Sequence, residues 1–462
     1  MKNLPGIVFV CLIALSLILT HQMARQSRLD QPVQPADREE VVFWHFWGGK
    51  DRAIVEQIAD DFNQSQEDYW VRAIAMPGNN LDTKIFLSVT GGDPPDLVNQ
   101  DDPIVADWAQ RGLIECLEDV ATPDEIQMLG EDLLPAAKSL GTYQDQLYAL
   151  CNGLDIRALY YNKTVLDQYQ LDPPTTIKDL DRIAQTIAPI GKSSERKSFG
   201  YLPDSRRMWA WGYVFGGEFI QGESQVSCDS PPIVAAANWM SQYSDWYGAD
   251  NIAAFRQGDQ SLPNKSFPLL PLTSEEQVGR YVLLMDGQWR TRDIKEFTER
   301  HRDSASLPEF GVCGLPQPPG GRANAGWVNG NFFVIPKTAR NKPGAWEFAK
   351  FWVGVNNRVR AAQYCQDGGW IPTTNSVSES PEFQAYLKDN LLFAEFVKLS
   401  RSKNQFPVPV VPGAPLFKRK VEQTASRLMT DSDLSAAEEL GRAKKEIQTH
   451  LNRSRNAGGG DE

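Results

Sequence analysis

Hydrophobic positions in the first hundred residues after the N-terminal segment alternate between two spacings. A continuous apolar run over 41–46 predicts a buried strand, and apolar positions between 54 and 62 recur at the three-to-four-residue spacing of a helix. The same alternation continues with a strand over 69–76, a helix over 81–89 and a short strand within 94–100. Strands that alternate with helices in this way predict a parallel sheet with helices on both faces.

The middle third of the chain has a different, mostly helical pattern. Asn162 is placed to cap one helix, and apolar positions within 173–188 predict another. A third helix is expected over 274–289, because Ser274 and Gln277 have capping-box spacing and Gly287 resembles a C-terminal stop. Strand character then returns near 310–316 and 331–336, and further helices are expected over 342–354 and 434–451.

The stretch "CNGLDIRALYYNK", residues 151–163, places charged residues between two strand-like runs. Asp155 and Arg157 would need partners if both were buried, because an unpaired buried charge is costly. Two interpretations follow from the residues alone. Either this is an ion-paired surface turn, or the chain crosses a cleft in which a polar molecule binds.

Composition narrows the function classes. The chain has 462 residues, enough for two or three domains, and a formal net charge of −12. This charge would repel a phosphate backbone, so nucleic acid is not an expected partner. Thirteen tryptophans are present, and an indole suits binding surfaces as well as cores. No phosphate-binding loop, dinucleotide fingerprint or hydrolase motif occurs, and the scattered His and Cys predict no metal site or cofactor.

The N-terminal segment predicts export. Residues 1–24 are typical of a signal peptide or of an uncleaved signal anchor, because the apolar run over 4–20 is just long enough to span a membrane. The segment 25–40 is typical of a polar tether, and 453–462 of a flexible tail. Cys11 lies inside the apolar run after Val10, which is not a lipid-attachment context.

Six stretches together resemble one family. "VVFWHFWGGKDRAIVEQIADDFN", "SVTGGDPPDLVNQDDPIVADWAQRGLIECLEDV", "LYALCNGLDIRALYYNKTVLDQ", "LLMDGQW", "GWVNGNFFVIPKTARNKPGAWEFAKFW" and "GGWIPTTN" are similar, in the correct order, to signatures of the extracellular solute-binding proteins of ABC importers. The similarity is to the carbohydrate group that includes maltodextrin-, trehalose- and glycerol-phosphate-binding members, and it spans about residues 40 to 450.

The resemblance implies an α/β, two-lobed periplasmic-binding-protein fold of the class II type. Each lobe would be a mainly parallel sheet flanked by helices, with the ligand cleft between the lobes. The first lobe would comprise 41–151 plus 314–370 and the second 152–313 plus 371–452. The stretch around Asp155 would then be a strand that crosses between the lobes. The expected ligand is a neutral sugar, a disaccharide or small glycoside, and the expected partners are the importer's transmembrane permease subunits. We expect a monomer at the outer face of the cytoplasmic membrane or in the periplasm, without enzymatic activity.

Sugar recognition requires flat apolar faces for C–H surfaces and planar polar groups for hydroxyls. The resemblance assigns these roles to eleven residues: Trp47, Gly48, Asp101, Asp155, Arg157, Trp209, Trp211, Trp289, Trp327, Asn329 and Trp370. For each, a structural role is the alternative. Asp101 would otherwise be a helix cap, Asp155 the ion-pair partner of Arg157, and each tryptophan part of the core. If the stretch that holds Trp209 and Trp211 is extended, only one of the two can face the cleft.

Two rival functions remain open, and so does the bonding state of one cysteine pair. A phosphorylated or charged solute would occupy the same fold, and a glycoside hydrolase would need two carboxylates across the cleft. Cys151 and Cys313 fall in segments that we expect to be neighbouring crossover strands in an oxidising compartment. They form either a disulfide or two buried thiols.

Overall fold

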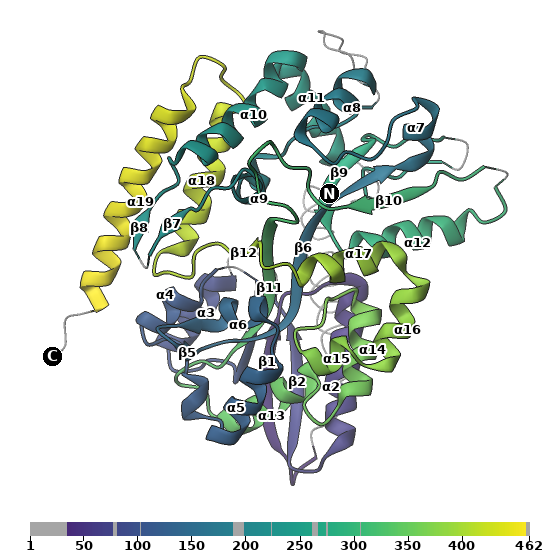
Figure 1. The fold of residues 1–462 in the computed structure, drawn as a ribbon. Helices are drawn as coiled ribbons and strands as arrows, with labels where there is room; N and C mark the ends of the chain where they lie inside the picture. Colours follow the sequence, from purple (N-terminus) through teal and green to yellow (C-terminus); the bar gives the residue numbers. More distant parts are fainter. Residues whose placement is uncertain are drawn as a thin grey trace, which may run out of the picture.

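Three parallel strands and their connecting helices form one end of the molecule (Figure 1). The computed structural model describes residues 35–76, 81–101, 103–187, 198–222, 224–260, 267–273, 276–304 and 306–458. Strand β1 (Glu39–His45) pairs in parallel with β2 (Tyr69–Ala75) and with β3 (Leu97–Gln100), and α2 (Gly49–Ser65) and α3 (Leu81–Thr90) connect them. The predicted strand–helix alternation of this region is therefore confirmed.

A single long strand connects this end to the rest of the chain. Strand β6 (Leu150–Asn162) is continuous through the charged stretch, and its N-terminal half pairs antiparallel with β11 (Gly326–Val334). Its C-terminal half pairs with β9 (Leu283–Gly287) on one edge and with β10 (Phe310–Cys313) on the other. The strand order is β10-β6-β11-β3-β1-β2, with β12 (Gln405–Phe406) on β11 and β9 on β6. Strands β6 and β11 thus run through the middle of the molecule and join two lobes (Figure 1).

Helices cover both lobes. Those associated with the parallel strands are α4 (Val105–Gln110), α5 (Pro123–Asp132), α6 (Pro135–Gly141), α13 (Lys342–Val353), α14 (Arg358–Gly368) and α15 (Asn375–Ser378). The others are α7 (Lys163–Gln168), α8 (Ile177–Ile187), α9 (Met208–Val214), α10 (Pro231–Tyr247), α11 (Ala249–Gln260), α12 (Arg290–Arg300), α16 (Pro381–Asp389), α17 (Leu391–Ser400), α18 (Ala414–Leu428) and α19 (Ala436–Gly458). The remaining elements of the described residues are short: the 3-10 turns Leu117–Asp119 and Ser205–Arg207, and the hairpins β4–β5 (Thr142–Tyr143, Gln146–Leu147) and β7–β8 (Ile220–Gln221, Gln225–Val226).

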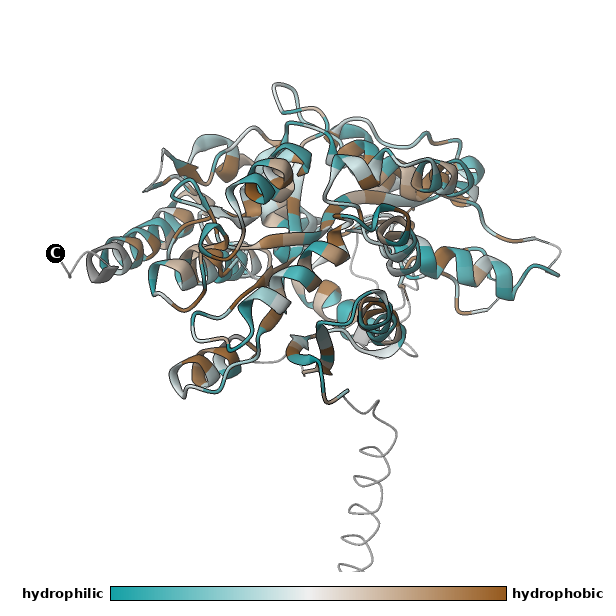
Figure 2. Cartoon of the chain, turned by 90° about the horizontal axis from the view of Figure 1, so that it is seen from below, coloured by the Kyte–Doolittle hydropathy of each residue, from teal (hydrophilic) through white to brown (hydrophobic). Residues whose placement is uncertain are grey.

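The hydropathy of these elements follows their position. Hydrophobic residues lie along the central strands and on the inner faces of the helices, and hydrophilic residues face outward (Figure 2). Val41 and Phe43 on β1 and Leu154 and Ile156 on β6 have no exposed surface. Buried residues alternate with half-buried ones on β1, whereas all four residues of β3 are buried, as expected of a parallel strand covered by helices on both faces.

The helix predicted over 274–289 is wrong. Residues 283–287 form strand β9, which pairs with β6 from Leu283↔Tyr161 to Gly287↔Arg157. The apolar run Tyr281–Met285 has no polar interruption, and such a run reads equally well as a buried strand or as a buried helix. Pairing with the long neighbouring strand decides between them.

Of the two alternatives for Cys151 and Cys313, a disulfide or two thiols, the disulfide is excluded. Cys151 lies opposite Phe332 of β11, whereas Cys313 lies opposite Leu159 of β6. Eight residues of extended strand separate Cys151 from Leu159, or roughly 26 Å at the rise of a strand. This separation is far beyond the reach of a disulfide. Both cysteines are free thiols.

Candidate functional site

An arginine held between two indole rings marks the junction of the lobes. The guanidinium carbon of Arg157 on β6 lies 4.6 Å from the ring centroid of Trp289 and 5.1 Å from that of Trp327. Arg157 is only 7% exposed and Trp327 only 5%, whereas Trp289 is half-buried. The two rings stabilise the charge through cation–π interactions, and they also fix the plane of the guanidinium.

The strand register brings these three residues together. Gly287 of β9 pairs directly with Arg157, and Val328 of β11 pairs with Ile156, so β9 and β11 flank Arg157 on its two edges. The ring of Trp289 folds back over Gly287, where any Cβ would overlap it. The glycine of the G-x-W sequence is therefore needed so that the tryptophan two residues later can cover the arginine.

This cluster contains hydrogen-bond donors without partners. Nε and Nη1 of Arg157, Nε of Arg207 and Nε1 of Trp327 are buried and make no hydrogen bond among the described residues. Burial, and after it the nearby charge of Arg207, lower the pKa of Arg157 to about 10, although the carboxylates of Asp155, Asp286 and Asp101 oppose this shift. Buried donors without partners are costly, so this group is suited to binding the oxygen atoms of a ligand.

Two predicted polar contacts, Asp155 and Asn329, lie on this pair of strands. Asp155 lies two residues before Arg157 on β6 and pairs in register with Asn329 of β11, whose side-chain amide donates to the backbone oxygen of Asp101 at 2.9 Å. The carboxylate of Asp155 accepts a hydrogen bond of 2.9 Å from Gln288. Burial raises the pKa of Asp155, and the charge of Arg157 and the bond from Gln288 oppose that rise.

Sequence reasoning missed three residues next to this cluster. Asp286 is 9% exposed and bonds Arg290 at 3.0 Å, with Arg207 at 3.6 Å on its other oxygen. Gln288 is fully buried beside β6. Asp286 and Gln288 lie within the "LLMDGQW" stretch, so the same stretch that indicated Trp289 could have indicated them. Nothing in the pattern around Arg207 distinguishes it from a surface arginine.

Trp47 and Trp370 form a separate aromatic cluster. The ring centroid of Trp47 lies 5.4 Å from that of Trp370 and 5.7 Å from that of Trp352, and all three are buried. Trp370 also lies against Gly153 of β6, so the cluster supports the crossover strand from the parallel-sheet side. Gly48 is exposed at the start of α2.

Trp209 and Trp211 belong to helix α9 and have no exposed surface. The ring of Trp209 packs 4.2 Å from that of Phe219, and the ring of Trp211 packs 4.5 Å from that of Trp239. The expectation that one of the two faces the cleft assumed extended backbone, and the helix removes that assumption. We leave both out of the proposed site.

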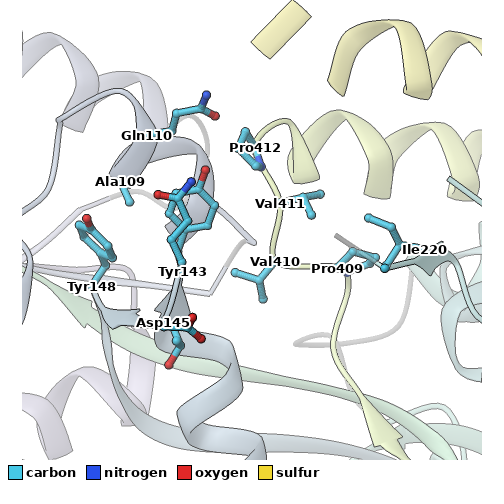
Figure 3. Close-up of a pocket in the computed structure, with 13 residues that line it drawn as sticks. Ala109, Gln110, Tyr143, Asp145, Tyr148, Ile220, Pro409, Val410, Val411 and Pro412 are labelled. Atoms are coloured by element: carbon cyan, nitrogen blue, oxygen red, sulfur yellow. The ribbon is translucent and has the colours of Figure 1, made fainter. Parts of the chain in front are cut away.

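A cavity of about 840 Å³ opens between the lobes away from the cluster (Figure 3). On one side Tyr143, Asp145 and Tyr148 approach it from the hairpin β4–β5, and on the other side lies the extended segment 409–412. None of the eleven predicted residues lines this cavity, and none of the buried unpaired polar atoms belongs to its lining. We therefore place the candidate site at Arg157, where polar groups require a partner.

Comparison with known proteins identifies the family. Residues 57–389 match the model of the bacterial extracellular solute-binding proteins, and the chain belongs to that family. It is 21% identical over 359 residues to a maltotriose-binding protein of Pyrococcus abyssi, a match that covers 74% of this chain and 68% of the relative. It is 20% identical over 371 residues to a maltooligosaccharide ABC transporter solute-binding lipoprotein of Streptococcus pneumoniae, a match that covers 78% and 77%.

Solved structures confirm the two-lobed fold. CpMnBP1 with mannotriose bound is similar with a TM-score of 0.73 and 21% identity, over 88% of this chain and all of that one. The sugar-binding protein MalE from Xanthomonas citri is similar with a TM-score of 0.71 and 15% identity, over 92% of this chain and all of that one. The predicted periplasmic-binding-protein fold is therefore confirmed. The family is extracellular, which supports export. No helix in the described ranges combines the length and apolar character needed to cross a membrane.

Proposed function

We propose that this protein is the substrate-binding component of an ABC sugar importer and captures a neutral sugar of disaccharide or small-glycoside size. The observation that carries the proposal is the cluster at Arg157, where two indoles, a carboxylate and unpaired donors meet on the strands that join the lobes. Sugars combine apolar C–H faces with many oxygens, which matches this combination of side chains. The relatives, which include a maltotriose-binding protein and a maltooligosaccharide-binding lipoprotein, support a sugar as the ligand.

We keep six of the predicted residues as ligand contacts: Asp101, Asp155, Arg157, Trp289, Trp327 and Asn329. Trp47 and Trp370 are kept as a second group that supports the crossover strand and borders the cleft, and Gly48 is kept as an exposed residue beside them. Closure of the lobes around β6 and β11 would bring contacts from both lobes onto the ligand, so binding shifts the population to the closed form. The lobe bounds 41–151 plus 314–370 and 152–313 plus 371–452 remain part of this proposal.

Permease subunits are the partners that this function requires, and the protein acts as a monomer and as a receptor without enzymatic activity. The N-terminal segment 1–24, and with it the predicted anchor over 4–20, lies outside the described residues. We propose that this anchor retains part of the protein at the outer face of the cytoplasmic membrane. N-terminal sequencing of a soluble periplasmic form that begins near Arg25 would contradict retention.

A thermal-shift screen tests the proposal. Ligands that bind only the native state raise its stability, by about 2.7 kcal/mol at a concentration of 100 Kd. The panel contains neutral disaccharides, small glycosides, their phosphate esters and uronic acids. We expect the largest shifts with neutral members. Shifts of the melting temperature only with charged members would show that the ligand is a charged solute and not a neutral sugar. Chromatographic detection of hydrolysis products would indicate a glycoside hydrolase instead.

A further inference from the structure

The side chain of Gln288 completes the edge of the strand that joins the lobes. Strand β9 pairs with β6 only as far as Gly287↔Arg157, because the chain then turns into α12. Beyond this point the amide oxygen of Gln288 accepts from the backbone nitrogen of Ile156 at 3.1 Å, and its amide nitrogen donates to the backbone oxygen of Leu154 at 3.2 Å. The side chain thus takes the place of the next strand residue.

A third segment continues the same edge. The backbone nitrogen of Leu154 donates to the backbone oxygen of Ile371 at 3.0 Å, in an isolated antiparallel bridge. Gln288 therefore fills the gap between the end of β9 and the segment at Ile371. Without it, two backbone groups of the buried central strand would lose their partners, and such groups are nearly always satisfied in proteins.

The same amide nitrogen reaches the candidate site. It donates to Oδ1 of Asp155 at 2.9 Å, while the other oxygen, Oδ2, accepts no hydrogen bond among the described residues. The buried side-chain amide of Gln288 therefore connects the backbone of β6 with the carboxylate of Asp155, and Gln288 itself is the residue that precedes Trp289. Hydrogen bonds to an ionised carboxylate are stronger than those between neutral groups.

We propose that Gln288 is a positioning residue for ligand binding: it fixes the Asp155 carboxylate so that Oδ2 meets a ligand hydroxyl, and it ties this contact to the crossover strand. The inference rests on the proposed function, because it takes Asp155 as a ligand contact. Gln288 does not itself touch the ligand.

The surroundings of Asp155 define the expected pH dependence. The charged groups that act on it are Arg157 on the same strand and Asp286 at the end of β9, with the neutral Asn329 opposite on β11. Burial and Asp286 raise the pKa of Asp155, whereas Arg157 and the bond from Gln288 lower it. Loss of that bond would let the pKa rise, so the ionised acceptor would be lost at a higher pH.

The test combines Gln288→Met with Asp155→Ala in a double-mutant cycle. Gln288→Met preserves length but removes the amide, and we expect it to weaken sugar affinity about tenfold in the wild-type background, the loss typical of a hydrogen bond to a charged group. In the Asp155→Ala background it should change affinity less than about twofold, because the carboxylate it acts on is gone. The midpoint of the affinity loss on acidification should also lie at a higher pH than in the wild type.

A matched control separates positioning from general destabilisation. Gln405 is likewise buried and donates to a backbone oxygen, that of Asn324, at 3.0 Å. Gln405→Met should lower the melting temperature without moving the pH midpoint of binding. If Gln288→Met does not fold, Gln288→Asn keeps an amide but is one methylene shorter, so it cannot reach both the backbone of β6 and Asp155, and it should show the same coupling.

The outcomes distinguish failure of the proposed sugar-binding function from failure of the role proposed for Gln288. If wild-type protein binds no sugar of the panel, the proposed function fails. If wild-type protein binds but Gln288→Met weakens binding equally with and without Asp155, or leaves the pH midpoint unchanged, Gln288 is only a structural residue and this inference is overturned.

Discussion

Trp289→Ala tests whether the indole ring of Trp289 stacks on the ligand rather than packing in the core. Trp289 is half-buried at the start of α12, and one face of its ring covers Arg157 at 4.6 Å. Loss of an aromatic stacking partner costs about 1–3 kcal/mol, which corresponds to a fall in affinity of about 5- to 150-fold. The lost cation–π contact with Arg157 adds about 0.5–2 kcal/mol of destabilisation, too little to unfold a chain of this size.

The assay is calorimetric titration with the tightest sugar of the panel, together with the melting temperature of the ligand-free variant. Trp246 is half-buried against Tyr243 and Tyr247 of α10, so Trp246→Ala is a control that removes an indole far from the cluster. We expect weaker binding only for Trp289→Ala. A folded Trp289→Ala protein with wild-type affinity would refute the stacking role.

Four further predictions follow from the same structure. Trp327→Ala should cost about 3–5 kcal/mol of stability in denaturant titrations, because this ring is 5% exposed, and a loss below about 1 kcal/mol would contradict its buried position. Gly287→Ala should weaken sugar binding with every aromatic residue retained, since its Cβ overlaps the ring of Trp289, and unchanged affinity would contradict that contact. Burial, and to a smaller extent the charge of Arg52, lowers the pKa of His45 to about 4, so the folded state resists protonation of this ring. The free energy of unfolding should therefore fall by up to about 3 kcal/mol as the pH drops from 6.5 to 4. His45→Phe should remove much of this pH dependence in urea titrations. Mapping of a non-reduced digest should find Cys151 and Cys313 as free thiols. Both thiols should react slowly with an alkylating reagent at pH 8, because burial raises the pKa of each to about 12.

Local patterns predicted the parallel part of the sheet well. Strand β1 contains the apolar run 41–44, β2 is apolar except for Arg72, and α2 has apolar positions at helical spacing, so each element is specified by its own residues. Strand β9 was missed because its apolar run does not distinguish strand from helix. Only the neighbouring strand β6, more than a hundred residues earlier in the sequence, decides that question.

The candidate site shows the same limit. The G-x-W sequence indicated Trp289, and Asp155 and Arg157 stood out as charges within a strand-like run. Their geometry depends on register, which places Gly287 and Val328 beside this part of β6, and no local pattern encodes that register. The same "LLMDGQW" stretch contains Gln288, but its hydrogen bonds to Ile156 and Leu154 depend on where β9 ends, which no local pattern shows.

Isothermal titration calorimetry of the full chain with neutral disaccharides and small glycosides tests the central claim most directly. We predict saturable one-to-one binding of at least one neutral sugar, loss of that binding in Arg157→Ala, and full recovery of the unaltered sugar by chromatography afterwards. Absence of heat across the neutral panel, or recovery of cleaved sugar, would contradict the claim that this protein is a receptor for a neutral sugar.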